Sequence, residues 1–251
     1  MNALRLSEIL KPSQLIWSLV LLATLLAAFT LSWNLHRQYN YGYGFWYDQM
    51  QIGEHIQKYG AQNRYIRGFN GLDKTTYRDL FAQIVDAVHS QGKGLAEIRF
   101  TDKRGVSKPL LREPEITHLQ DVANLIDTLT MAGGFAVLFA GIGSLLLVQR
   151  KIPVQLKPQL TIFGGLIGLL ILLTLIIGPE RVFYQFHVWV FPDDHQWFFF
   201  YQESLMSTMM KAPDLFGGIA VSITALGLLL FAGFVILLTQ LTGQRNTAAH
   251  Q

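Results

Sequence analysis

The sequence contains no cysteine. Disulfide exchange, thiolate metal centres and cysteine nucleophiles are therefore excluded as its chemistry, and so is a four-span thiol oxidase. The serine-hydrolase signature G-x-S-x-G is also absent, and neither Ser204 nor Ser207 has a distinguishing sequence context. Any reaction must rely on other side chains.

Charged residues are scarce as well, at 15% of the chain against about 25% in soluble domains. Hydrophobic residues make up 51% of it. This composition indicates a protein that lies in lipid. The net charge of +3 is explained below by membrane orientation, and nothing predicts nucleic-acid binding.

Four charge-free stretches are longer than the roughly 20 apolar residues that cross a hydrocarbon core. We place the spans within them at residues 15–35, 129–148, 159–178 and 217–240. The apolar run of the first is longer than that of a usual signal peptide and no clear A-x-A site follows, so we expect an uncleaved anchor.

The basic residues between the spans predict the orientation. An even number of spans places segments 1–14, 149–158 and 241–251 on one side. The single acid on that side is Glu8, and its basic residues are Arg5, Lys11, Arg150, Lys151, Lys157 and Arg245. Because Lys and Arg mark cytoplasmic loops, these segments are predicted to be cytoplasmic and segments 36–128 and 179–216 external.

The first external segment is large enough for a small domain. We expect a helix over 45–59, a second helix starting at a capping box of Thr76 and Asp79 and stopping at Gly92, and a short strand over 95–100. A turn over 102–105 is expected after the strand.

Pro114 suits the first turn of a further helix that leads directly into the second span. The predicted fold class is an all-α membrane protein, in which four transmembrane helices carry a mainly helical extracytoplasmic cap formed by loops 1 and 3.

The second external segment is strongly aromatic. Its rings are typical of an interfacial aromatic belt, and its prolines Pro179, Pro192 and Pro213 predict a chain that folds along the membrane surface.

None of the seven histidines lies inside a predicted span, which argues against haem ligation. The lack of charge there also argues against an ion path. Chemistry is therefore expected at the outer surface, where His118 and His187 lie on one side of the bilayer. Two imidazoles can act as acid and base around one ester. The alternative is a pair of interfacial histidines that only satisfy local hydrogen bonds.

Two carboxylates lie near His118 in sequence. Glu115 and Asp121 are three residues before and after it, so either can reach its ring on a helix and fix its tautomer. His195 is an additional candidate because it shares a short loop with His187. Glu115, His118, Asp121 and His187 also form a mixed N/O set suited to zinc, although no H-E-x-x-H is present.

Two stretches resemble the bacterial lipoprotein intramolecular transacylase family, called Lit. The run from Glu115 to Val122 resembles its E-x-x-H-[ML]-x-D-V element, with leucine at Leu119. The second element, an F-H pair followed by F-x-x-D-x-W and P-x-x-F, is matched by Phe186, His187, Phe191, Asp194, Trp197, Pro213 and Phe216. The four spans and the two unequal outer loops match the family's layout.

The resemblance implies an acyltransferase of the bacterial cytoplasmic membrane whose active face is extracytoplasmic. It would move the sn-2 acyl chain of an S-diacylglyceryl cysteine to the α-amino group of that cysteine, which gives a lyso-form lipoprotein. The partners would be diacylglyceryl-modified lipoproteins and membrane lipids, with no cofactor consumed and no resident metal.

The family's two functional histidines would correspond to His118 and His187. We expect supporting roles for Glu115, Asp121, Asp194 and Trp197 and substrate contacts from Arg181, Tyr184 and Phe186. The rival interpretations are a non-catalytic membrane protein that binds lipid or a partner, and a metal-dependent membrane hydrolase.

Overall fold

The computed structural model describes residues 12–152 and 156–247. Two compact units divide this part of the chain. Unit 1 comprises the described parts of Met1–Asn34, Thr130–Gly178 and Ile223–Gln251, and unit 2 comprises Leu35–Leu129 and Pro179–Ser222. The predicted cytoplasmic residues Arg5, Glu8 and Lys11 lie outside the described residues, as do the side chains of Lys157 and Arg245.

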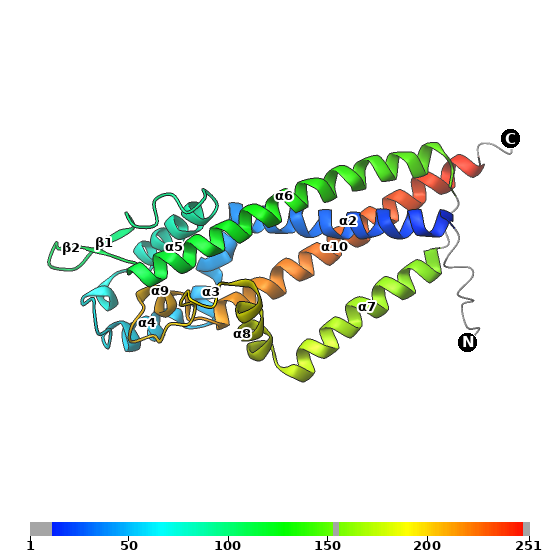
Figure 1. Ribbon diagram of the computed structural model, residues 1–251. Coiled ribbons are helices and arrows are strands. Elements are labelled where there is room, and N and C mark those ends of the chain that lie inside the picture. The colour runs from blue at the N-terminus through cyan, green and yellow to red at the C-terminus, as the bar shows by residue number, and fades with distance from the viewer. Residues whose placement is uncertain (1–11, 153–155, 248–251) are drawn as a thin grey trace. The chain divides into compact units, whose positions relative to one another are not determined.

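Four long helices are apolar enough to cross a membrane. They are α2 (Pro12–Gln38), α6 (Glu113–Gln149), α7 (Leu156–Ile177) and α10 (Asp214–Thr247), shown in Figure 1. Each of them overlaps one predicted span, and the predicted four-helix membrane fold is confirmed. Helix α6 is much longer than its predicted span because the helix expected after Pro114 continues into it without a break.

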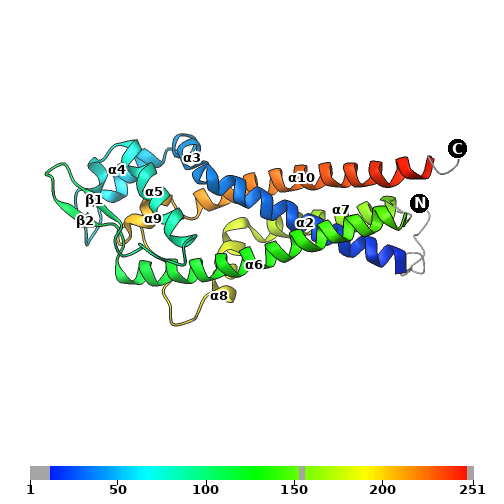
Figure 2. The same cartoon turned by 90° about the horizontal axis from the view of Figure 1, so that it is seen from above.

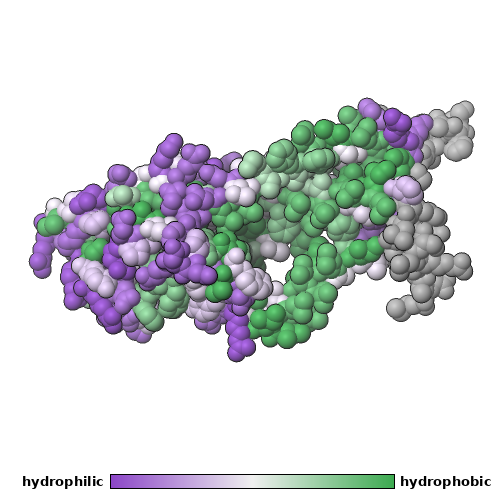
Figure 3. All heavy atoms as spheres, viewed as in Figure 1, coloured by the Kyte–Doolittle hydropathy of each residue, from purple (hydrophilic) through white to green (hydrophobic). Residues whose placement is uncertain are grey.

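Close packing of α2 against its neighbours holds unit 1 together. An added Cβ at Gly133 would lie 2.5 Å from Thr30, and one at Gly143 would lie 2.5 Å from Val20. Such close approach of backbones is typical of helix interfaces in membranes. The Ser32 hydroxyl donates to the Ile223 carbonyl at 2.8 Å. In Figure 3 the outer surface of these helices is almost continuously hydrophobic, as expected of a lipid-facing surface.

Short helices and one hairpin form unit 2, and Figure 2 shows them from a second direction. Its short elements are η1 (Asn40–Gly42), α3 (Tyr43–Gln49), α4 (Ile52–Gly60), η2 (Phe69–Gly71), α5 (Lys74–Val88), β1 (Arg99–Thr101), β2 (Ser107–Pro109), α8 (Pro179–Val190) and α9 (Leu205–Met210). The end of α2 and the first turns of α6 and α10 also belong to unit 2.

Two expectations for unit 2 need correction. The helix predicted over 45–59 is two helices, because Gln51 adopts a left-handed φ of 54° that interrupts the hydrogen-bond ladder. Helix α5 starts at Lys74, two residues before the predicted capping box at Thr76, and ends at Val88, four residues before the predicted stop at Gly92. Asp73 is its N-cap and accepts from the Thr76 N–H at 2.7 Å, a role for which aspartate is well suited.

The strand predicted over 95–100 is shorter and lies later in the chain: β1 covers Arg99–Thr101, and residues 95–97 form a turn. The turn predicted over 102–105 is present, with the Gly105 N–H donating to the Asp102 carbonyl. Strands β1 and β2 pair antiparallel, with Phe100 opposite Lys108. Asp102 closes the turn, since its Oδ1 accepts from the N–H groups of Arg104 and Val106. Its other oxygen lies 2.7 Å from Lys108 Nζ. Of the prolines in the aromatic segment, Pro179 is the first residue of α8, a position that suits its fixed φ.

Candidate functional site

Helix α6 presents the first histidine. Because Glu115, His118 and Asp121 are three residues apart, they lie along one side of its first turns. Glu115 is fully buried and His118 is 8% exposed. The Nδ1 atom of His118 is buried and has no hydrogen-bond partner among the described residues. A buried polar atom in this state is available to a bound group.

Helix α8 presents the second histidine in its last turn. His187 is also 8% exposed, and its Nδ1 lies 2.8 Å from the Phe183 carbonyl oxygen. A carbonyl only accepts, so Nδ1 carries the hydrogen and the neutral ring keeps its lone pair on Nε2. Burial lowers the pKa of His187, and the hydrogen bond to Phe183 opposes this in part. The ring is therefore poised as a proton acceptor.

These two rings meet in unit 2. Their centres are 5.9 Å apart, although 69 positions separate the two residues in the chain. The sequence predicted only that they share one side of the membrane. With this spacing, one reacting group can contact both imidazoles at once.

Aromatic side chains surround the pair. Phe191 lies 5.0 Å from the His118 ring and 5.1 Å from the His187 ring. Phe183 and Trp197 lie 4.2 Å and 4.9 Å from His187. Such walls exclude water and strengthen electrostatic interactions at the histidines.

Glu115 does not orient His118 as expected. Its Oε1 accepts from the Ser204 hydroxyl at 2.5 Å, and its Oε2 accepts from the Arg112 N–H at 2.8 Å. Arg112 Nε lies 3.2 Å from Oε2, at ion-pair distance but without hydrogen-bond alignment. Ser204 is itself the N-cap of α9 and accepts from the Ser207 N–H. Glu115 thus ties the start of α6 to the start of α9.

Sequence reasoning gave Ser204 no role. Serine is a favoured N-cap residue, and Ser204 directly precedes the helix-forming residues Leu205 and Met206, which is the one signal for its structural position. Nothing in the sequence predicts its contact with Glu115.

Asp121 also has a different partner. Its Oδ2 lies 2.7 Å from Nδ1 of His195. This hydrogen bond raises the pKa of His195, with a further contribution from the charge of Asp194. The additional histidine of the sequence is therefore bound to the carboxylate that was expected to serve His118.

The remaining expected contacts are more peripheral. Asp194 and Arg181 are exposed, and Phe186 is 43% exposed although its ring lies 5.5 Å from that of His187. Tyr184 packs 5.8 Å from Trp197. Burial and the neighbouring Glu180 raise the pKa of Tyr184.

The proposed zinc ligands do not form a metal centre. In residues 12–152 and 156–247, no three His, Asp or Glu side chains are grouped to hold an ion. The oxygens of Glu115 are directed at Ser204 and Arg112.

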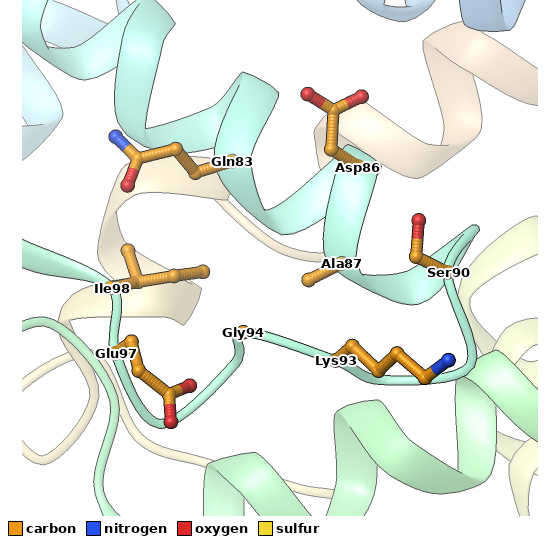
Figure 4. Close-up of a pocket in the computed structure, with 8 residues that line it drawn as sticks. All are labelled: Gln83, Asp86, Ala87, Ser90, Lys93, Gly94, Glu97 and Ile98. Carbon is orange, nitrogen blue, oxygen red and sulfur yellow. The ribbon is translucent and has the colours of Figure 1, made fainter.

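A separate cavity of about 260 Å³ lies between α5 and the turns before β1. Figure 4 shows Ala87 and Ile98 pointing toward each other across it, while the carboxylates of Asp86 and Glu97 point in opposite directions. Its charged groups do not converge on a common point, so we assign it no ligand.

Comparison with known proteins gives a consistent result. A model of the lipoprotein intramolecular transacylase family Lit matches residues 9–212. No curated protein sequence matches the chain significantly. Three solved structures match, all of the membrane integral lipoprotein intramolecular transacylase Lit from Bacillus cereus.

One of these structures is 17% identical, covers 94% of this chain and 98% of its own, and has a TM-score of 0.69. Another, with a histidine replaced by arginine, is 16% identical over 94% of both chains, with a TM-score of 0.66. At these identities the structures show a shared fold, while the family match covers most of the chain. The chain is a multi-pass membrane protein that belongs to the lipoprotein intramolecular transacylase family, and it is an acyltransferase.

Proposed function

We propose that this protein moves the sn-2 acyl chain of an S-diacylglyceryl cysteine to the α-amino group of the same cysteine, in a bacterial lipoprotein. His118 and His187 are the proposed acid and base. The observation that carries the proposal is their 5.9 Å ring separation inside a buried aromatic cluster.

His187 is the proposed base. Its hydrogen bond to the Phe183 carbonyl fixes the tautomer that leaves Nε2 free, and the lowered pKa keeps that nitrogen unprotonated at neutral pH. His118 is the proposed acid, because its Nδ1 has no partner among the described residues and can face an oxyanion. Burial lowers the pKa of His118 to about 4, with a further contribution from the charge of His187, so the ring is neutral at neutral pH and donates through its N–H.

The steps balance without a cofactor or second lipid. The substrate ammonium first loses one proton to solvent. The amine nitrogen then attacks the ester carbon, and His187 Nε2 takes a proton as the N–C bond forms. The bond from that carbon to the glycerol oxygen breaks, and this oxygen receives a proton from a ring N–H of His118. Transfer of a proton from His187 to His118 restores both rings.

Direct attack closes a medium-sized ring through the thioether sulfur, so the geometry of the bound lipid controls the rate. The aromatic wall formed by Phe183, Phe191 and Trp197 suits this task. It restricts the lipid near the histidines and keeps water, which would hydrolyse the ester, away from the reacting carbon.

The outer residues of this segment fit a lipid substrate. Trp189 is 78% exposed and Val188 and Phe186 also face outward on α8, which offers apolar surface for acyl chains. Arg181 and Tyr184 are proposed to contact polar parts of the lipid. The proposed location is the outer leaflet of the bacterial cytoplasmic membrane, as the distribution of basic residues indicates.

The test uses purified protein in lipid nanodiscs and a synthetic diacylglyceryl lipopeptide, with the product N-terminus read by tandem mass spectrometry. The wild-type protein should give the N-acyl, S-monoacylglyceryl peptide. His118→Ala and His187→Ala should each lower the rate at least about 100-fold, whereas His89→Ala, the matched control, should retain it. Unchanged diacyl peptide from the wild type would favour the rival binding protein.

A further inference from the structure

The pair formed by His195 and Asp121 has no part in the proton transfers above. Asp121 lies one helical turn beyond His118 on α6, and His195 lies in the segment that connects α8 to α9. Residues 191–203, here called the aromatic loop, contain no helix or strand. Phe191, Trp197 and Phe199 of this loop supply rings within 6.1 Å of one or both proposed catalytic histidines.

Few other hydrogen bonds hold the middle of the aromatic loop in place. Near its end, Gln202 accepts from the Arg64 N–H, and Glu203 pairs with an exposed Arg64 guanidinium. Within residues 192–200, the described side-chain hydrogen bonds are that from Gln196 to the Phe198 carbonyl, inside the loop, and that of His195 with Asp121.

We propose that His195 is a positioning residue, which binds Asp121 to hold the aromatic loop and its rings against the proposed histidine pair. This role rests on the proposed function, since it matters only if His118 and His187 act on substrate. The positions of His195 and Asp121 support this role. Each of them is close in the sequence to a residue of the site, so a change in their contact affects the site directly.

The contact depends on pH in a defined direction. The charged groups that act on His195 are Asp121 on α6 and Asp194 in the loop, and both raise its pKa above the usual 6.5. The extra stabilisation of the loop is therefore fully present below pH 6.5 and is lost as the pH rises through the raised pKa. The loop should be held more tightly in acid than in alkaline buffer.

Hydrogen–deuterium exchange of the loop tests the contact without any need for activity. In nanodiscs, the wild-type protection factors of residues 191–203 should fall at least about threefold as the pH rises from 6 to 9. His195→Ala and Asp121→Asn should lower them at pH 6. His195→Gln, which can still donate a hydrogen bond but cannot titrate, should give intermediate protection that does not change with pH. Asp193→Asn, an exposed acid in the same loop, is the matched control.

The lipopeptide assay then tests the consequence. His195→Ala should lower the turnover rate about tenfold or more, and the double variant with Asp121→Asn should be no slower than the slower single variant. The wild-type turnover rate should decline at alkaline pH as the His195 contact weakens, and the His195→Gln rate should show no such decline.

Protection factors that match the wild type in every variant would overturn the proposed contact. Faster loop exchange with unchanged turnover would overturn its positioning role. An inactive wild-type protein would contradict the proposed function itself, while the exchange data would still decide whether His195 holds the loop.

Discussion

At the scale of single residues, a backbone carbonyl decides the chemistry of His187. The Phe183 carbonyl can only accept, so it selects one tautomer of the imidazole, and burial keeps the ring neutral. His118 differs because its Nδ1 has no partner among the described residues. The two rings are close in space but differ in their hydrogen-bond partners and in their proposed roles.

This difference predicts the acid side of the pH–rate profile. Because the pKa of His187 is lowered from 6.5, the base stays unprotonated below that pH. The substrate ammonium has a pKa of roughly 8, so its protonation already lowers the rate below that pH. Protonation of His187 should add a second, steeper fall that begins only below about pH 6.5. Initial rates of lipopeptide conversion between pH 4.5 and 9 check this, and a second limb centred well above 6.5 would contradict the assignment of His187 as the base.

At the scale of elements, a buried carboxylate joins two helices. Glu115 accepts from Ser204 at the start of α9 and from the Arg112 backbone at the start of α6. One of its partners belongs to another helix, and the other lies at the start of its own helix. The main function of Glu115 is therefore structural.

Removal of this carboxylate should be costly. Glu115→Ala leaves the Ser204 hydroxyl and the Arg112 N–H without their acceptor and the Arg112 guanidinium without its ion-pair partner. It should lower the free energy of unfolding by roughly 3 kcal/mol. Glu113→Ala is the matched control on the same turn, where the side chain is exposed, and it should cost less than about 1 kcal/mol. Thermal unfolding in detergent measures both. Equal melting temperatures for the two variants would show that the buried contact contributes little.

Two glycines of α6 give a second comparison between elements. A Cβ at Gly143 would meet Val20 of α2 at 2.5 Å, whereas one at Gly141 would meet nothing within 4 Å. Gly143→Val should therefore destabilise the protein by about 1–3 kcal/mol through overpacking, and Gly141→Val should not. Melting temperatures of the two variants decide this, and a larger loss for Gly141→Val would contradict the observed packing.

At the scale of the whole molecule, orientation in the membrane follows from charge. The segment at 149–158 carries basic residues between two spans, which predicts that it is cytoplasmic and that unit 2 faces outward.

The absence of native cysteine makes this orientation testable. Ser90→Cys places a single thiol at an exposed position of unit 2, just after α5, and Gln149→Cys places one at the end of α6 while every basic residue is retained. A membrane-impermeant maleimide should label Ser90→Cys in intact cells, and Gln149→Cys only after the membrane is opened. The reverse pattern would invert the proposed topology.

The sequence by itself predicted the four long apolar helices and the helix that continues from Pro114 into the second of them, and it placed both histidines outside the predicted spans. These features depend on local composition and periodicity, which a linear pattern records directly. The sequence did not predict the break between α3 and α4 at Gln51, because a left-handed backbone at a glutamine has no strong sequence signal.

Only the tertiary structure decided the partners of the site residues. Helical spacing suggested that Glu115 or Asp121 would bind His118, yet Glu115 binds Ser204 at the start of α9 and Asp121 binds His195 in the aromatic loop. Spacing along a helix shows which side chains are neighbours, but hydrogen bonds form with whichever donor the packing brings nearest. The meeting of His118 with His187 was decided in the same way: by the packing of α6, α8 and the aromatic loop.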